Sequence, residues 1–276
     1  MNIPALANTA SELCAAGRHA EAASAYREAA GEHREREDDP FPMEMRAAGC
    51  LEHSGDVEGA ISAYGALGEQ LQVEARALQE AAPRAAIGAR VKSGEAFAAA
   101  ARLRAAHIRD FEDERQARRL YWGAAAGHGI AGSMLRERAK GMDPADPLAQ
   151  ADVLARAGDE LREASQLWKL TDSDGRPGVL TELLEAATAY HGAAELYSRG
   201  GLAGVAAMMF LKAAEALSRA LPLDHELNGA AHAARVQGMA DANHASAARC
   251  FSAVGADEKS AEVWGRLVQR EAGVTS

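Results

Sequence analysis

The fold is decided by the stretch Gly17-Arg18-His19-Ala20-Glu21-Ala22-Ala23-Ser24-Ala25-Tyr26-Arg27-Glu28-Ala29. Its skeleton is a glycine, a small residue five positions later, a ring four positions further and a small residue three beyond that. Residues three and four apart share one face of an α-helix, so the small, ring and small positions form one stripe. The glycine precedes this helix, where the chain reverses and positive φ is required. The stretch therefore predicts a turn followed by a helix that packs closely against a neighbour.

The same skeleton returns along the chain. Its copies are Gly55, Ala60, Tyr64 and Leu67; Gly94, Ala99, Leu103 and Ala106; Gly201, Ala206, Phe210 and Ala213; and Gly255, Ser260, Trp264 and Leu267. Imperfect copies without the glycine carry the rings Tyr121, Trp168 and Phe251. One helical hairpin cannot bury its own apolar face, so several must stack. We therefore predict an all-α fold, a right-handed α-solenoid of about seven helical hairpins plus a terminal helix.

The bulky positions of this skeleton are expected to form the core. They are Tyr26, Tyr64, Leu103, Tyr121, Trp168, Tyr190, Tyr197, Phe210, Phe251 and Trp264. Helical hairpins are predicted at about 5–35, 43–81, 84–109, 180–221 and 223–254, with a last helix from about Asp257. The Gly- and Pro-containing break near 141–147 predicts a joint between two parts, 1–140 and 141–276, of one continuous solenoid.

The pattern resembles the tetratricopeptide repeat, whose second helix carries the same order of Gly, small, aromatic and small residues. The best match to both helices of that repeat is Tyr190, Ala193, Ala194, Tyr197, Gly201, Ala206, Phe210 and Ala213. The spacing of 38 residues between Gly17 and Gly55 exceeds the family's repeat length. In this respect the chain is more similar to divergent members of the family, such as the soluble NSF attachment proteins. The resemblance implies a solenoid that binds other proteins, and it specifies no chemistry.

Composition and cysteine usage favour a cytoplasmic globular chain. Apolar residues make up 48% and charged residues 25%, so global disorder is excluded. The excess of Arg over Lys, together with the high Ala and Gly content, indicates that the chain is encoded by a bacterial genome of high GC content. We expect no secretory signal and no membrane span, because no apolar run is long enough. Cys14, Cys50 and Cys250 are widely separated, so we expect small buried thiols and no disulfide framework.

Charge is unevenly distributed along the chain. The net charge is −10, yet residues 84–140 carry 12 basic and 6 acidic side chains between two acidic ends. The densest basic part also contains aromatic rings, and we predict that it binds a partner through Arg102, Arg109, Arg115, Arg118, Arg119, Tyr121 and Trp122, with Arg104 in the same segment. Arginine binds carboxylate or phosphate through two parallel hydrogen bonds, which favours an acidic protein partner. Nucleic acid is disfavoured because the rest of the chain repels a polyanion.

A second interpretation of this basic segment is local. Asp110, Glu112, Asp113 and Glu114 lie at helical spacing from the arginines and would pair with them on a solvated helix face. Under that interpretation the segment is surface and not a docking site.

Metal and cofactor sites are not predicted. Asp172-Ser173-Asp174-Gly175 is similar to part of a calcium loop, but the register that puts Gly175 sixth places Leu170 first and Thr181 twelfth, where carboxylates are needed. His225 and His232 could share a helix face, as could His191 and Glu195, yet neither pair forms a known metal-binding motif.

Enzyme motifs are equally scarce. The sequence contains no phosphate-binding P-loop, no dinucleotide-binding Gly-x-Gly-x-x-Gly and no Gly-x-Ser-x-Gly nucleophile motif. Cys50 and His53 fall one helical turn apart, a spacing more typical of packing than of a nucleophile with its base.

Three function classes remain open at this stage. The first is a non-catalytic scaffold that holds an acidic peptide or helix in the groove of the repeats' first helices. The second is a regulator that closes around a small molecule or signalling peptide, which a deep apolar pocket lined by Tyr190, Tyr197 and Phe210 would favour. The third is an enzyme or accessory subunit with carboxylates or histidines of shifted pKa near 141–147.

Overall fold

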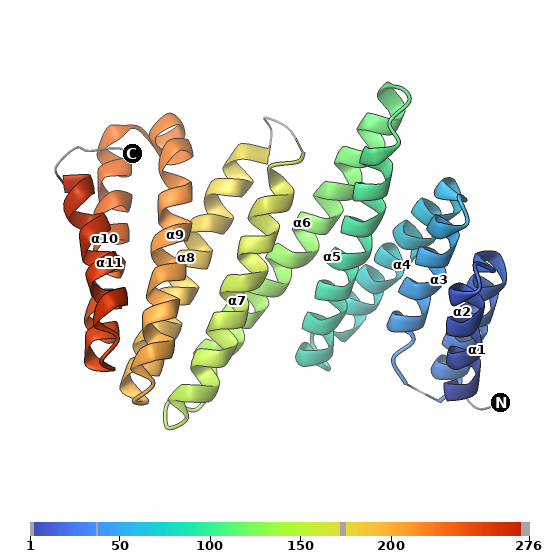
Figure 1. The fold of residues 1–276 in the computed structure, drawn as a ribbon, viewed down its shortest axis with the longest axis horizontal. Helices are drawn as coiled ribbons and strands as arrows, with labels where there is room; N and C mark the ends of the chain where they lie inside the picture. The colour runs from blue at the N-terminus through green and yellow to red at the C-terminus, as the bar shows by residue number, and fades with distance from the viewer. Residues whose placement is uncertain (1–2, 37, 172–174, 272–276) are drawn as a thin grey trace. The chain divides into compact units, whose positions relative to one another are not determined.

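A computed structural model describes residues 3–36, 38–171 and 175–271, which form α-helices joined by short turns (Figure 1). These eleven helices of the described residues are α1 (Ile3–Ala15), α2 (His19–Glu35), α3 (Phe41–His53), α4 (Val57–Leu78), α5 (Pro83–Ala106), α6 (Phe111–Lys140), α7 (Pro147–Trp168), α8 (Arg176–Arg199), α9 (Ala203–Asn228), α10 (Ala230–Ala253) and α11 (Asp257–Glu271). Within these ranges there is no β-strand.

The chain divides into two compact units, Met1–Gly127 and His128–Ser276, which we call unit 1 and unit 2. In unit 1, each of α1 to α4 packs against the next helix, and in unit 2 each of α7 to α10 does the same (Figure 1). This succession of neighbouring helices confirms the predicted all-α solenoid class. The loop near 141–147, where we predicted a joint, lies within unit 2 between α6 and α7.

Glycine ends the first helix of a hairpin in one repeated way. Gly17, Gly55, Gly201 and Gly255 all adopt positive φ, between 73° and 84°. At the first of them, the amide of Gly17 donates to the carbonyl of Cys14 and the amide of Arg18 to that of Leu13. This pair of hydrogen bonds is the Schellman motif. It provides donors for carbonyl groups that have no hydrogen-bond partner within the helix at its C-terminal end. The skeleton in the sequence therefore marks four real turns.

Gly94 is the exception, and the predicted turn there was wrong. It lies inside α5, where a Cβ added to the facing Gly127 of α6 would come within 2.9 Å of the Gly94 backbone. The glycine therefore serves a close approach between two helices and not a chain reversal. The predicted hairpin 84–109 is accordingly the single helix α5.

The hairpin predicted at 223–254 was also wrong, because α10 spans most of it without a turn and α9 extends through Pro222 to Asn228. The hairpins expected at 5–35, 43–81 and 180–221 are present, as is the last helix from Asp257. Longer helices leave four hairpins with this glycine turn in the described residues, α1–α2, α3–α4, α8–α9 and α10–α11, with α5, α6 and α7 between the second and the third, in place of about seven hairpins.

The predicted core positions are mostly buried. Side chains at most 8% exposed are Tyr26, Tyr64, Leu103, Tyr121, Tyr190, Tyr197, Phe210 and Phe251. Trp168 is partly buried against the α8–α10 cluster. Trp264 is 42% exposed, so its core assignment was wrong. In α11 it is the neighbouring Val263, together with Leu267, that faces inward.

Candidate functional site

Residues of the basic segment form an ion-pair network in unit 1, in which Arg104 and Asp113 are buried and Glu58 and Arg109 are exposed. The Arg104 side chain is 3% exposed, and its guanidinium donates to Asp113 at 2.8 Å and to Glu58 at 2.9 Å. Arg109 donates to the same two carboxylates, at 3.0 Å and 2.7 Å. The hydrogen bond from Arg109 lowers the pKa of Asp113, and the one from Arg104 lowers the pKa of Glu58. These ion pairs connect α4, α5 and α6. Because Arg104 and Arg109 already pair with Glu58 and Asp113, their charges are neutralised within the protein.

Two further predicted arginines pair along α6. Arg115 contacts Glu112 at 2.8 Å, three residues away, and Arg118 contacts Glu114, four residues away. Such exposed pairs at helical spacing contribute little to stability, about 0.3–0.5 kcal/mol each. Their effect here is to neutralise the surface of the helix. The local interpretation of the segment therefore accounts for these side chains.

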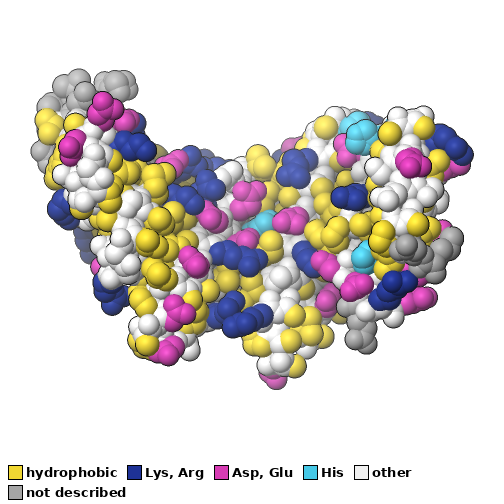
Figure 2. All heavy atoms as spheres, turned by 60° about the horizontal axis from the view of Figure 1, so that its bottom comes forward, with side chains coloured by type: hydrophobic (Ala, Val, Ile, Leu, Met, Phe, Trp, Pro, Cys, Tyr) yellow, Lys and Arg dark blue, Asp and Glu magenta, His cyan; other side chains and the backbone are white. Residues whose placement is uncertain are grey.

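The remaining predicted partner-binding residues divide into exposed and buried ones. Arg102 and Arg119 are exposed and form no ion pair within residues 3–36, 38–171 and 175–271. Trp122 is 58% exposed, whereas Tyr121 is 8% exposed and belongs to the core. On the face that Figure 2 shows, basic and acidic side chains are interleaved. The segment thus presents two unpaired arginines and one exposed ring, not a continuous basic band.

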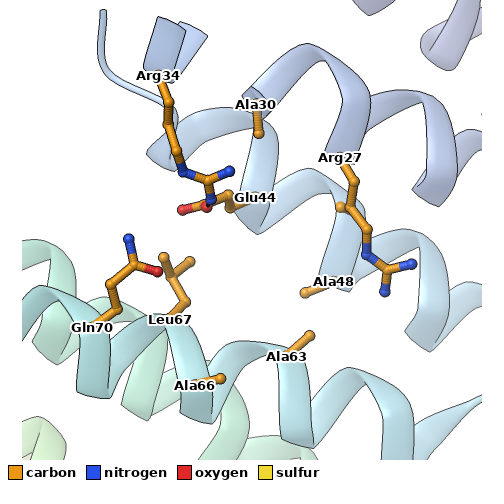
Figure 3. Close-up of a pocket in the computed structure, with 10 residues that line it drawn as sticks. Arg27, Ala30, Arg34, Glu44, Ala48, Ala63, Ala66, Leu67 and Gln70 are labelled. Atoms are coloured by element: carbon orange, nitrogen blue, oxygen red, sulfur yellow. Dashed lines mark ion pairs between the residues drawn. The ribbon is translucent and has the colours of Figure 1, made fainter. Parts of the chain in front are cut away.

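A cavity that the sequence did not reveal lies between α2, α3 and α4 in unit 1. Its volume is about 330 Å³. Its walls are mainly small or apolar: Ala30, Ala47, Ala48, Ala63, Ala66 and Leu67, with Arg27, Arg34, Glu44 and Gln70 completing the lining (Figure 3). We call it the α2–α4 pocket. Ligand sites typically begin at about 300 Å³, so this one has room for one or two side chains of a partner.

The polar residues of the α2–α4 pocket are not equivalent. Arg34 of α2 forms an ion pair with Glu44 of α3, and Figure 3 shows the two side chains meeting. Arg27, two turns earlier on α2, is exposed and forms no ion pair among the described residues. Gln70 approaches from α4 on the opposite side. The pocket therefore combines an apolar floor with one guanidinium whose charge is not neutralised.

The position of this pocket differs from the expected groove. We predicted binding along the first helices of the repeats, whereas α2 and α4 are second helices that flank α3. A cavity on first helices does occur in unit 2, where α8 and α10 flank α9 around Leu217, Met239 and the hydrogen-bonded pair His191 and Asn243. Its volume is about 240 Å³, and it carries no Arg or Lys.

The deep pocket expected around Tyr190, Tyr197 and Phe210 is filled by the rings themselves, which lie in the core of unit 2. Tyr190 donates to Asp159 of α7 at 2.7 Å, and Tyr197 donates to Asp152 of the same helix. Burial raises the pKa of both phenols, and the neighbouring carboxylates raise it further. These two hydrogen bonds connect α8 to α7.

The loop near 141–147 does not gather catalytic groups in the structure. Asp146 caps α7 by accepting from the amide of Ala149 at 3.1 Å, and Asp143 accepts from the amide of Ala145 at 2.9 Å. The strongly shifted carboxyl of unit 2 lies elsewhere, on α8. Burial, then the charge of Glu185, raise the pKa of Glu182 to about 7.

Metal ligands do not cluster in the described residues, where no three His, Cys, Asp or Glu side chains are placed to hold an ion. His232 donates from Nδ1 to the buried Asp224 at 2.7 Å. His191 lies 3.4 Å from Glu195 as a solvated pair. Asp172-Ser173-Asp174, the acidic part of the calcium-like loop, lies outside the described residues. No helix within the described ranges has the length and apolarity to cross a bilayer.

The thiols are arranged differently from the sequence expectation. His53 interacts through Nδ1 with the carbonyl of Gly49, 2.7 Å away, while Cys50 contacts Cys14 across two helices. Cys14 precedes Gly17 by three residues and Cys50 precedes Gly55 by five, so both lie near the ends of first helices in adjacent repeats. First helices of adjacent repeats lie side by side, so the placement of both cysteines near the ends of such helices was the signal that could have revealed the contact.

No protein-family model and no curated protein sequence matches the chain. Among solved structures it is similar to the DHF58 filament, at 17% identity and a TM-score of 0.36 over 96% of both chains. It is also similar to the de novo designed helical repeat protein DHR64, at 17% identity and a TM-score of 0.33 over 98% of this chain and 100% of that one. A monomeric IFIT1 mutant with m7Gppp-AAAA has 13% identity and a TM-score of 0.21, covering 97% of this chain and 69% of that one.

Proposed function

We propose that this chain is a non-catalytic adaptor that binds an acidic segment of another protein, with one carboxylate of that segment seated on Arg27 at the α2–α4 pocket. The observation that carries the proposal is an exposed guanidinium, without an ion pair in the described residues, beside a cavity floored by alanine and leucine. A carboxylate of the ligand would accept charge-assisted hydrogen bonds from the Arg27 guanidinium and neutralise its charge. The resemblance to tetratricopeptide repeats supports the same class of function, because such repeats hold peptides on their helix faces.

The lining of the pocket also defines the neighbouring residue of the ligand. Ala63, Ala66 and Leu67 of α4 present an apolar wall opposite Arg27. An apolar side chain adjacent to the ligand's carboxylate would bury its surface there, at about 25 cal/mol per Å². The preferred segment therefore contains an acidic residue followed or preceded by an aliphatic one. Arg34, already neutralised by Glu44, contributes less to this preference.

The test is selection from a random peptide library on the purified chain, followed by affinity measurement with fluorescently labelled peptides. We expect enriched peptides with adjacent acidic and aliphatic residues, and an affinity that falls with salt. Arg27→Glu, which repels the carboxylate, and Ala66→Trp, which fills the cavity from an exposed position, are each expected to weaken binding at least about tenfold, equivalent to 1.4 kcal/mol.

The matched control is Arg119→Glu, which reverses an exposed arginine of the basic segment that also has no ion pair in the described residues. It is expected to leave affinity within about twofold, since an isolated surface charge has a small effect. Loss of binding on the triple reversal of Arg115, Arg118 and Arg119, with Arg27→Glu unaffected, would move the site to the basic segment. Enrichment of peptides without acidic residues would overturn the proposed ligand class.

A further inference from the structure

Two cysteines far apart in the sequence meet inside unit 1. Cys14 lies near the end of α1 and Cys50 lies on α3, and their sulfur atoms are 3.8 Å apart. The Cys50 thiol donates a hydrogen bond to the sulfur of Cys14. A disulfide requires a sulfur–sulfur distance of about 2.05 Å, so a side-chain movement of less than about 2 Å would join them. No other residue separates the two sulfurs along this contact.

A histidine lies beside the same pair. Nδ1 of His19, at the start of α2, is 3.6 Å from the Cys14 sulfur. The ring of His53 packs against the His19 ring with 5.5 Å between centroids, and His53 is itself held by the Gly49 carbonyl. Neutral imidazole is a common acceptor for a thiol proton, and the thiolate is the reactive form of cysteine. Cys14 therefore has a base within reach, while its sulfur also receives the Cys50 hydrogen bond.

The two thiols differ in exposure. Cys14 is partly exposed, whereas Cys50 is 3% exposed. Burial, then the hydrogen bond to Cys14, raise the pKa of the Cys50 thiol to about 11, so it stays protonated at neutral pH. The arrangement separates two roles: a reachable sulfur that meets a reagent and a protected sulfur directly behind it. In such an arrangement the exposed cysteine is oxidised first, and the buried thiol then condenses with it to form a disulfide.

We propose that Cys14 and Cys50 form a redox-active pair, which a hydroperoxide such as hydrogen peroxide converts into a disulfide that links α1 to α3. Unlike the adaptor role, this is a modification site, and it does not depend on the α2–α4 pocket.

The reaction balances in two steps. His19 takes the proton of the Cys14 thiol, the thiolate attacks one peroxide oxygen, the O–O bond breaks, and the departing hydroxide takes that proton as water. Cys14 is then a sulfenic acid. The Cys50 sulfur attacks the Cys14 sulfur, the S–O bond breaks, and the hydroxyl leaves with the Cys50 proton as a second water. Two thiols are oxidised to one disulfide while one hydrogen peroxide is reduced to two waters.

Oxidation would change the attachment of α1. The two cysteines are 36 residues apart, and a cross-link across that loop restricts the unfolded chain. In the reduced protein α1 packs against α2 and the cluster around Tyr26, and no covalent bond joins it to α3. We therefore expect the oxidised protein to unfold at a higher temperature and to protect the α1 amides from hydrogen exchange more strongly.

The test treats the reduced full chain with hydrogen peroxide and analyses tryptic peptides by mass spectrometry. Cleavage after Arg and Lys places Cys14 in peptide 1–18, Cys50 in 47–76 and Cys250 in 250–259, so each pairing is distinguishable. We expect a loss of about 2 Da and a cross-link of 1–18 with 47–76, both reversed by dithiothreitol. A cross-link that involves 250–259 instead, or no cross-link once peroxide has oxidised any cysteine, would overturn the proposal.

Variants separate the roles of the two sulfurs. Cys50→Ala is expected to leave a Cys14 sulfenic acid that dimedone traps, whereas Cys14→Ala is expected to leave Cys50 unlabelled. Cys250→Ala is the matched control and is expected to preserve both the disulfide and its rate. His19→Asn is expected to slow dimedone labelling of the Cys50→Ala protein at least about threefold. Equal labelling of Cys14 and Cys250 in the Cys50→Ala protein would contradict the assigned roles, and circular dichroism of each variant checks that it is folded.

Discussion

The two units bury their tyrosines in different chemical settings. In unit 1, Tyr26 and Tyr64 pack among alanines and aliphatic side chains, and neither hydroxyl reaches a hydrogen-bond partner in the described part of the chain. In unit 2, Tyr190 and Tyr197 each donate to an aspartate of α7. The repeat skeleton thus specifies a buried ring of a given volume. Whether the tyrosine hydroxyl also forms a hydrogen bond depends on the side chains of the neighbouring helix. The difference predicts that the hydroxyl groups of these tyrosines contribute more to stability in unit 2 than in unit 1.

The largest effect is expected from removing the rings. Tyr64→Ala and Tyr190→Ala are each expected to lower the free energy of unfolding by about 3–5 kcal/mol, as for other buried aromatic residues. Tyr190→Ala is expected at the upper end, because it also removes the hydrogen bond to Asp159 and the ring below Lys212, 5.1 Å away. Urea unfolding followed by circular dichroism measures both. A change below about 1 kcal/mol for either variant would contradict its place in the core.

The turns and most core rings could be predicted because they depend on local sequence. Gly17, Gly55 and Gly201 are followed by a small residue and a ring at fixed spacing, and this order determines both the turn and the buried face. Gly94 carries the same spacing without a turn, because the glycine is needed there for its lack of Cβ against Gly127. Sequence periodicity does not distinguish these two uses of glycine, and so the number of hairpins was overestimated.

The candidate site could not be predicted because it depends on contacts between helices. The α2–α4 pocket consists of alanines whose open space is visible only when α2, α3 and α4 are assembled. Arginine density along the sequence pointed instead to 102–122, where buried and surface carboxylates neutralise Arg104, Arg109, Arg115 and Arg118. Arg27 and Arg34 of α2 lie among four glutamates of the same helix, so the segment gave no basic compositional signal.

A pH-dependent effect is expected from Glu182 in unit 2. Its folded-state pKa is about 7, above the usual 4.5, so the folded protein retains a proton that the unfolded chain releases. The stability associated with this carboxyl is therefore complete below about pH 4.5 and is lost as the pH rises through 7. Glu182→Gln, which stays neutral, is expected to raise the free energy of unfolding by up to about 3 kcal/mol at pH 8 and to change it little at pH 4.

The matched control for that prediction is Glu185→Gln, which removes a carboxylate paired with Arg136 at 2.8 Å. It removes the repulsion between Glu185 and ionised Glu182 but also loses the ion pair with Arg136, so at pH 8 it is expected to stabilise the protein distinctly less than Glu182→Gln does. Urea unfolding from pH 4 to 8 measures both variants, and hydrogen exchange of α8 peptides assigns the change to unit 2. Identical pH profiles for the wild type and Glu182→Gln would show that Glu182 is not shielded from water.

A smaller effect tests whether the hydroxyl anchor prevents a ring from moving. A Cβ on Gly158 would lie 2.6 Å from the Tyr190 ring, and one on Gly68 would lie 2.9 Å from the Phe97 ring. Tyr190 is held by its hydrogen bond to Asp159, whereas the Phe97 ring has no polar atom and lies between Gly68 and Gly123. Gly158→Ala is therefore expected to cost about 1–3 kcal/mol and Gly68→Ala distinctly less.

The control for both glycine variants is Gly31→Ala in the interior of α2, where an added Cβ meets no atom within 4 Å. It is expected to stabilise the protein by up to about 1 kcal/mol through helix propensity. An equal cost for Gly158→Ala and Gly68→Ala would mean that hydroxyl anchoring does not limit the movement of the ring.

The smallest effect isolates the hydroxyls alone. Tyr190→Phe and Tyr197→Phe each remove a donor from an aspartate and are expected to cost about 1 kcal/mol, the usual net value of one hydrogen bond. Tyr26→Phe and Tyr64→Phe remove oxygens without a protein partner in the described residues, so their cost is expected within about 0.5 kcal/mol of zero. Because the ring volume is unchanged in all four variants, no cavity contributes to the comparison. Similar costs in both units would mean that the unit 1 hydroxyls are satisfied by ordered water, and that the two units differ only in which acceptor they use.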